Sequence, residues 1–193
     1  MSDAKGIFAA LASVLAVVGN VPYLRDVIRR AITPHPYTWF IWSIVSGVTF
    51  VGGLVKGAGI GAVPTGVAES FTLVIFLFSL RNGFRGVAKV DHLFLAAALL
   101  ALISWAITRE PTAAVVIVVS IDLIAFAPAL RKTWLDPRSE QPILFVANVI
   151  RHALTLGALQ NYNLATILHS VSMIVTNTAM TLIIVRRRRG GAR

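Results

Sequence analysis

The sequence has 193 residues, of which 56% are hydrophobic and only 13% charged, with a net charge of +10 and no cysteine. A soluble domain carries about 25% charged residues, so this composition excludes an ordinary water-facing surface, and the lack of cysteine excludes disulfides and thiolate chemistry. Continuous apolar windows of about 20 residues favour membrane-spanning helices over a barrel. Seven such windows occur, at 5–22, 37–56, 62–80, 92–108, 111–130, 142–160 and 163–185.

The seven windows predict an all-α polytopic membrane protein that forms a single transmembrane domain over 1–193. Lysine and arginine are concentrated in alternate connections between the windows. Fourteen of the 18 lie there: Arg25, Arg29, Arg30, Arg81, Arg85, Lys89, Arg131, Lys132, Arg138, Arg186 to Arg189 and Arg193. This is the positive-inside pattern, so we expect an outside N-terminus, a cytoplasmic C-terminus and a basic cytoplasmic tail at 187–193. The distribution indicates a lipid bilayer rather than nucleic acid as partner. We expect the inner (cell) membrane of a bacterium.

The first connection is basic and bracketed by prolines, and it occurs twice. Residues 21–36 read VPYLRDVIRRAITPHP, and residues 127–142, which lie 106 positions later, read APALRKTWLDPRSEQP. Four positions are identical in the two copies: Pro22 and Pro128, Leu24 and Leu130, Arg25 and Arg131, and Pro36 and Pro142. Because proline lacks an N–H and fixes φ, Pro22 and Pro128 are interpreted either as paired hinges or as helix ends.

The repeated turn divides the chain into two similar units. We expect a three-helix repeat at 5–81, a linker helix at 92–108 and a second three-helix repeat at 111–186. Three spans reverse the side of the membrane, and the linker restores it, so the two repeats are parallel (a 3+1+3 arrangement of seven helices). Parallel repeats place a substrate site near mid-membrane at their interface.

This layout, the outside N-terminus and the paired P-x-L-R turns resemble the SWEET and PQ-loop superfamily of transporters. Members of that family carry Pro-Gln at each turn, whereas Tyr23 and Ala129 stand at the glutamine positions here. The resemblance implies two three-helix bundles, with the linker helix packed beside the first bundle. It also implies alternating-access transport of a small solute, and a proton-coupling role for an acidic residue before the second turn, which would be Asp122.

Charged and polar side chains inside spans usually face a cavity or a partner. Asp122 and Arg151 both lie near mid-membrane by residue count, so we expect either an ion pair between them or a coupling role for Asp122. Glu69 either pairs with His169, at similar depth, or reaches outer water. His152 is either a satisfied interior histidine or a proton relay, and it should point away from Arg151, because adjacent helical residues lie about 100° apart.

Pockets of the SWEET type are lined by tryptophan and asparagine from both halves. At the 106-residue offset, Trp42 aligns with Asn148, and counting back from Arg81 and Arg186 aligns Thr72 with Asn177. These four residues are the candidate substrate-binding lining, although Trp42 is equally well explained by lipid or core packing. Gly57, Gly59 and Gly61 lie in the connection between the second and third windows, and they form either a simple outer turn or an extracellular gate.

The expected function is transport of a small polar solute, sugar-like by resemblance, by alternating access. The alternatives are a proton-coupled amino-acid or vitamin transporter and a non-transporting scaffold or receptor. The four histidines lie at scattered depths, so we expect neither a metal site nor a cofactor, and no nucleophile–base spacing indicates an enzyme. A single chain is sufficient for a pathway, whether it works as a monomer or within a homo-oligomer.

Overall fold

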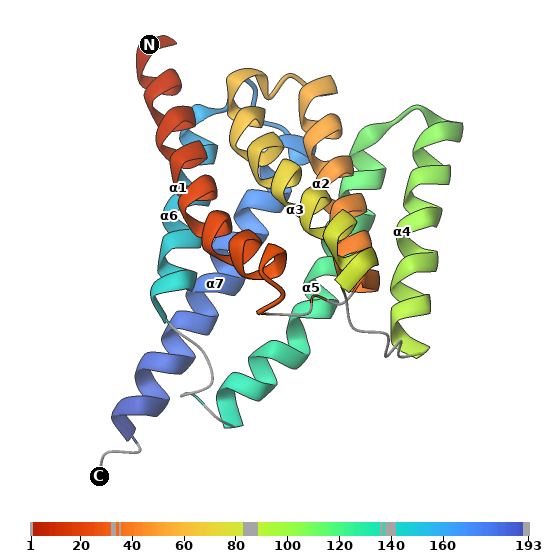
Figure 1. Cartoon of the computed structure of the whole chain (residues 1–193). Helices are drawn as coiled ribbons and strands as arrows, with labels where there is room; N and C mark the ends of the chain where they lie inside the picture. The colour runs from red at the N-terminus through yellow and green to blue at the C-terminus, as the bar shows by residue number, and fades with distance from the viewer. Residues whose placement is uncertain are drawn as a thin grey trace.

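The computed structural model describes residues 2–31, 34, 36–82, 89–135, 137 and 142–190. The regular structure of these residues is helical, as the sequence predicts (Figure 1). The elements are α1 (Ser2–Ile28), α2 (Pro36–Val55), the short 3-10 helix η1 (Gly59–Ala62), α3 (Val63–Asn82), α4 (Lys89–Thr108), α5 (Pro111–Leu135), α6 (Pro142–Ala158) and α7 (Leu164–Gly190). The basic residues Arg85, Arg138 and Arg193 lie outside the described residues.

Within the described residues, three helices are long and apolar enough to cross a membrane. They are Asp3–Ile28, Gly59–Arg81 and Leu164–Arg189. Shorter apolar stretches occupy Trp39–Val55, Leu95–Thr108 and Pro111–Ile124. The chain is therefore an all-helical protein with membrane-spanning potential in at least these three helices.

Both repeated prolines lie inside helices, so the interpretation that they end helices is wrong. Pro22 lies within α1, which continues to Ile28. Pro128 lies within the bounds of α5, and its side chain is outside the described part. A proline has no N–H to donate, so the carbonyl of Val18, four residues before Pro22, loses its usual partner. Both helices thus contain a site where bending is cheap, and the hinge role stays a prediction.

The helix α7 incorporates most of the expected basic tail. Arg187, Arg188 and Arg189 form its last turn, where positive charge is favourable because the helix dipole is negative at its C-terminus. The Arg187 guanidinium lies 5.1 Å from the centre of the Trp134 ring, and its Nε donates to the Trp134 carbonyl at 3.2 Å. The end of α7 is therefore attached to the end of α5.

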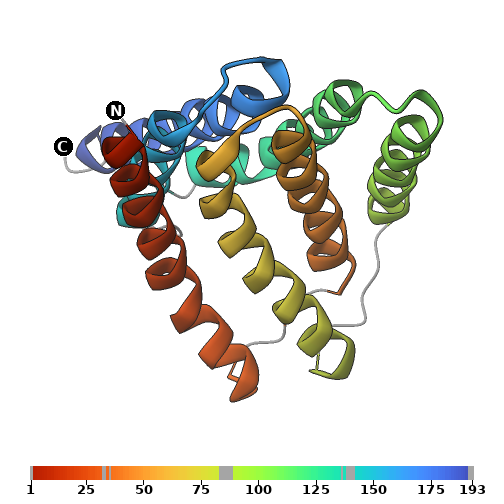
Figure 2. The ribbon, with the colours of Figure 1, turned by 90° about the horizontal axis from the view of Figure 1, so that it is seen from above.

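The helices form two layers (Figure 2). One layer contains α1, α3, α2 and α4, with α3 between α1 and α2. The other contains α5, α6 and α7, with α7 packed against both α5 and α6. Across the layers, α1 packs on α6 and α2 packs on α5, where small and branched side chains are buried: Val45, Val48, Ala114, Val115 and Val118. The linker helix α4 contacts α2 of the first triplet and α5 of the second.

The two layers are joined tightly at one end of the molecule, which also carries the N-terminus (Figure 1). There the connection at 56–62 meets the connection at 159–163, and we call this contact the junction. The Gln160 N–H donates to the Ala58 carbonyl at 3.1 Å, and the Asn163 side-chain amide donates to the Lys56 carbonyl at 2.9 Å. The Lys5 ammonium adds a bond of 2.7 Å to the Leu159 carbonyl.

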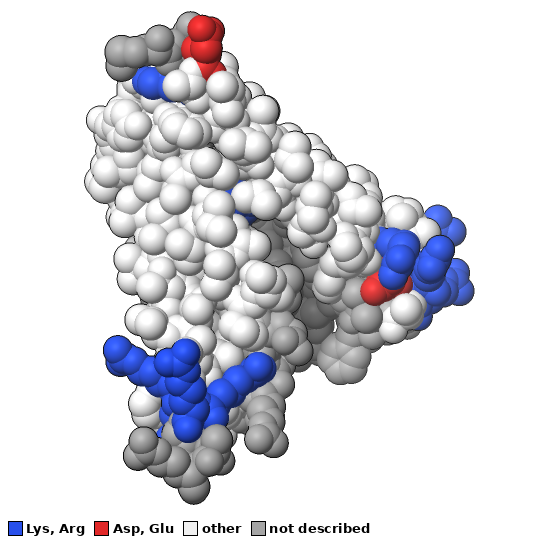
Figure 3. Space-filling model, turned by 90° about the vertical axis from the view of Figure 1, so that its left-hand side faces the viewer, with Lys and Arg blue, Asp and Glu red and all other residues white. Residues whose placement is uncertain are grey.

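At the opposite end, the described residues leave the two layers apart. Figure 3 shows two separate groups of lysine and arginine with a hollow in the surface between them. The sequence places Arg25, Arg29 and Arg30 at the end of α1 and the arginine run at the end of α7. The layers are thus closed at the junction and spread apart between the basic helix ends.

The connection before α5 carries an exposed ion pair. The Lys56 ammonium lies 2.9 Å from Glu110 Oε1, and the Thr112 N–H donates to the same oxygen at 2.9 Å. The hydrogen bonds from Thr112, followed by that from Lys56, lower the pKa of Glu110 from 4.5 to about 2.

We expect Glu110→Gln to lower the melting temperature slightly at pH 7, because exposed ion pairs contribute little. A lowered pKa stabilises the folded state above pH 4.5, and that stabilisation is lost as the pH falls towards 2. Thermal unfolding of both proteins in detergent should therefore show the difference at pH 7 and its loss near pH 2. A difference that persists unchanged at pH 2 would contradict this assignment.

Candidate functional site

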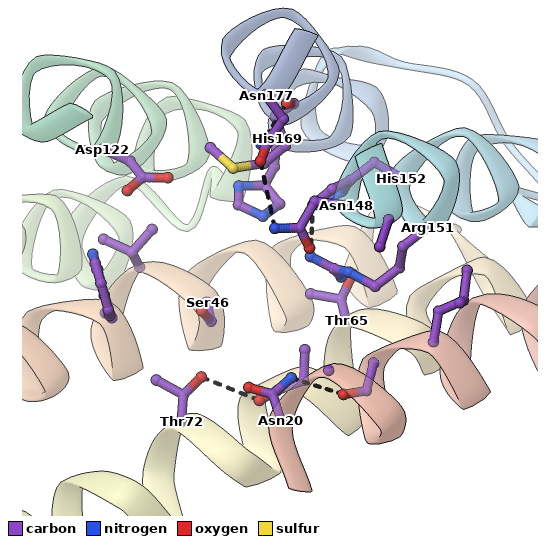
Figure 4. Close-up of a pocket in the computed structure, with 18 of the residues that line it drawn as sticks. Asn20, Ser46, Thr65, Thr72, Asp122, Asn148, Arg151, His152, His169 and Asn177 are labelled. Carbon is purple, nitrogen blue, oxygen red and sulfur yellow. Dashed lines mark hydrogen bonds between the residues drawn. The ribbon is translucent and has the colours of Figure 1, made fainter. Parts of the chain in front are cut away.

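A cavity of about 420 Å³ lies between the two layers (Figure 4). Its walls come from α1, α2 and α3 on one side and from α5, α6 and α7 on the other, and none of the lining residues that the structure describes belongs to α4. Pockets for small molecules typically have volumes of about 300–1,000 Å³. The cavity is thus large enough for a small solute and is built by both triplets.

The lining of this cavity follows the sequence repeat. Residues 106 positions apart line the cavity in pairs. Each pair has one residue on a helix of the first triplet and the other on the corresponding helix of the second triplet. On α2 and α6 the pairs are Trp39 and Phe145, Trp42 and Asn148, Val45 and Arg151, and Ser46 and His152; on α1 and α5 they are Ala16 and Asp122, and Asn20 and Phe126. On α3 and α7, Ala68 and Met173, and Thr72 and Asn177, are 105 residues apart. The same face of each matched helix therefore borders the cavity.

All four residues of the predicted binding set line the cavity. The Asn148 amide donates to Asn177 Oδ1 at 3.4 Å, and the Asn177 amide donates to the Met173 carbonyl at 2.7 Å. The Thr72 hydroxyl donates back to the Ala68 carbonyl of its own helix at 3.1 Å. Trp42 lines the cavity and is 41% exposed.

Asp122 on α5 and Arg151 on α6 also line the cavity, and Figure 4 shows them apart from each other on the wall that α5, α6 and α7 form. The expected ion pair between them is not formed. Arg151 Nη2 lies 2.7 Å from His152 Nε2 instead, and the structure gives Asp122 no hydrogen-bond or ion-pair partner among the described residues. The cavity therefore contains a carboxylate and a guanidinium that do not neutralise each other directly.

His152 is buried and has a partner at each ring nitrogen. Because arginine only donates, Nε2 must accept from Arg151, which assigns the proton to Nδ1; this nitrogen then donates to the Ser170 hydroxyl at 3.3 Å. These partners favour the satisfied interior histidine. The expectation that Arg151 and His152 point apart is wrong, because the long arginine side chain reaches back to its neighbour.

His169 and Glu69 do not pair with each other. His169 lines the cavity and lies edge-on to His152, with ring centres 5.4 Å apart, while its Nδ1 is buried and has no hydrogen-bond partner among the described residues. Glu69 forms a hydrogen bond with Ser46, and its Oε2 is buried with no partner in the part of the chain that the structure describes. Matching depth in the membrane did not predict contact, because Glu69 faces α2 rather than α7.

The sequence prediction omitted several lining residues. The polar ones are Asn20, Ser46 and Thr65, and the aromatic ones are Trp39, Phe126 and Phe145. The 106-residue offset contained the signal for one of the polar residues, since it aligns Ser46 with the candidate residue His152. Thr65 lies one turn before Ala68 on α3, and helix periodicity applied to the predicted Thr72 would have reached it.

Comparison with known proteins returned no matching family model, no matching curated protein and no matching solved structure. Among the described residues, no group of three or more histidine, aspartate or glutamate side chains could hold a metal ion.

We expect His152→Leu to destabilise the protein by about 1–3 kcal/mol, because it leaves the Arg151 guanidinium without its acceptor in a buried site. His152→Gln is the matched control, since its side-chain oxygen can accept the same hydrogen bond. Thermal unfolding in detergent would separate the two variants. Equal losses in both would show that packing of the imidazole, rather than the hydrogen bond, is what matters.

Proposed function

We propose that the chain is a seven-span membrane transporter for a small polar solute. Two parallel three-helix repeats, α1–α3 and α5–α7, would alternate access to the cavity between them, with α4 as the linker. The observation that carries the proposal is the paired lining of the cavity, in which residues 105 or 106 positions apart border the same space. A substrate site at the interface of two repeats is the arrangement on which alternating access depends.

The shape of the molecule supports this proposal. The two layers meet at the junction and are spread apart at the basic end (Figure 3). With the basic end in the cytoplasm, this arrangement would correspond to an inward-open conformation, in which the cavity communicates with the cytoplasmic side. The junction then lies on the outer side, beside the N-terminus (Figure 1).

Uptake into liposomes tests the proposal directly. Purified protein would be reconstituted and assayed with sugars, amino acids and vitamins, with and without a pH gradient. We expect saturable uptake of at least one solute. A well-folded protein that takes up none of them would leave the scaffold or receptor alternative.

We expect Asn148→Ala to lower this uptake at least about tenfold, because loss of one hydrogen-bonding group in a polar site costs about 1.4 kcal/mol or more. Asn148 lines the cavity, whereas Ile150, two residues further along α6, is 49% exposed on the outside of the molecule. Ile150→Ala is therefore the matched control and should retain uptake. Equal losses in both variants would contradict a binding role for Asn148.

A further inference from the structure

The two charged residues of the cavity, Asp122 and Arg151, have no charged counterpart at the corresponding positions of the first repeat. Asp122 corresponds to Ala16 at the 106-residue offset, and Arg151 corresponds to Val45. All four positions line the cavity. The first triplet packs its helices with small apolar residues at these positions, so packing does not require charge there. Both charges therefore lie in one half of the cavity, and the corresponding positions of the other half are apolar.

The structure keeps the two charges apart and directed at the same space. Arg151 is held by His152, which is in turn held by Ser170. This contact uses one of the five N–H donors of the guanidinium, and the described residues provide no further hydrogen-bond acceptor for the others. Asp122 lies on α5, apart from Arg151 on the same wall of the cavity, without a hydrogen-bond or ion-pair partner among the described residues (Figure 4).

An uncompensated charge inside a membrane is costly and usually marks a binding or transport site. Here two opposite charges face one cavity, and a ligand that carried both complementary charges would offset both costs. A neutral sugar would leave Asp122 and Arg151 unpaired. A purely cationic solute would leave Arg151 unpaired, and a purely anionic one would leave Asp122 unpaired.

We propose that the transported solute is a small zwitterion, with its carboxylate bound to Arg151 and its protonated amine bound to Asp122. Guanidinium binds carboxylate through paired N–H donors, which fixes both distance and orientation. Asn148 and Asn177 supply hydrogen-bonding groups to the space between the two charges (Figure 4). This inference rests on the proposed transport function and replaces the sugar-like solute with a charged one.

The test compares solutes that differ by one charge. The full-length protein in detergent would be screened for thermal stabilisation by the twenty standard amino acids, betaine and a set of neutral sugars, and each active compound would be assayed for uptake into liposomes. Every active zwitterion would then be compared with its decarboxylated amine and its deaminated acid. We expect each single-charge analogue to bind about thirtyfold more weakly or worse, as the loss of one buried charge pair predicts.

Two variants test the orientation of the solute. Asp122→Asn should reduce binding of the zwitterion and reverse the preference towards the deaminated acid. Arg151→Gln should reverse it towards the decarboxylated amine. Asp26→Asn, which removes a carboxylate paired with Arg25 at the surface, is the matched control and should change neither preference.

The possible results separate this inference from the proposed function. Saturable uptake of a neutral sugar, unaffected by Asp122→Asn and Arg151→Gln, would overturn the zwitterion and keep the transporter. Uptake of a solute with a single charge, or a zwitterion whose analogues bind equally well, would do the same. No saturable uptake of any solute by folded protein would overturn both.

Discussion

Under the proposed alternating-access function, replacing Gly61 by alanine should shift the protein from the inward-open towards the outward-open conformation. A Cβ at Gly61 would lie 2.7 Å from the Leu159 Cα and 2.8 Å from the Leu159 nitrogen. Backbone atoms cannot rotate away as a side chain can, so η1 and the 159–163 connection must separate. Overpacking of this kind typically costs about 1–3 kcal/mol, and in a two-state transporter that cost falls only on the state in which the junction is closed.

Cysteine labelling measures the shift, since the chain has no cysteine of its own. A single cysteine at Ser46, which lines the cavity, would be labelled by a membrane-impermeant maleimide from either side of oriented vesicles. We expect Gly61→Ala to raise labelling from the outside about tenfold, which corresponds to about 1.4 kcal/mol. Gly53→Ala is the matched control, because a Cβ there meets only Ala58 Cβ, at an ordinary 3.7 Å.

A lower melting temperature without any change in labelling would show that the junction is a fixed structural contact. In that case the simple outer turn, rather than a gate, would be the correct interpretation of the three glycines in this connection.

Hydropathy predicted the order of the helices but not their ends. The first window ends at Pro22, whereas α1 continues to Ile28. The last window ends at Val185, whereas α7 continues through the arginines to Gly190. Apolar windows report contact with lipid, while a helix ends only where its backbone stops forming hydrogen bonds. Arginine is a good helix former, so the basic turn remains helical beyond the apolar stretch.

The internal repeat correctly predicted residues that line the cavity, whereas depth in the membrane did not correctly predict which side chains are in contact. The offset placed Trp42 and Asn148 on matching helix faces, and both line the cavity. Depth alone suggested that Asp122 pairs with Arg151. Depth ignores the direction in which a side chain leaves its helix, and the reach of arginine to His152 depends on that direction and on side-chain torsions. A single sequence contains neither.

A double-mutant cycle should show that Asp122 and Arg151 are independent in folding but coupled in transport. The structure forms no ion pair between them, so the unfolding free-energy changes of Asp122→Asn and Arg151→Gln should add to within about 0.5 kcal/mol. Each single variant should lose most of the uptake rate. The double variant should be only slightly slower than the slower of the two single variants. Once either end of the site is lost, the other can no longer orient the solute.

The combination of these two outcomes distinguishes the competing roles. If the two residues formed a structural ion pair, removing one partner would leave the other charge buried and unopposed, which typically costs about 3–5 kcal/mol of stability. The second substitution would remove that charge and recover the cost. The unfolding free energies would then show a coupling of this size. A scaffold or receptor would tolerate the double variant without loss of activity. Only a solute that bridges the two charges gives additive effects on stability together with strongly non-additive effects on uptake, because the coupling then exists in the bound complex and not in the empty protein.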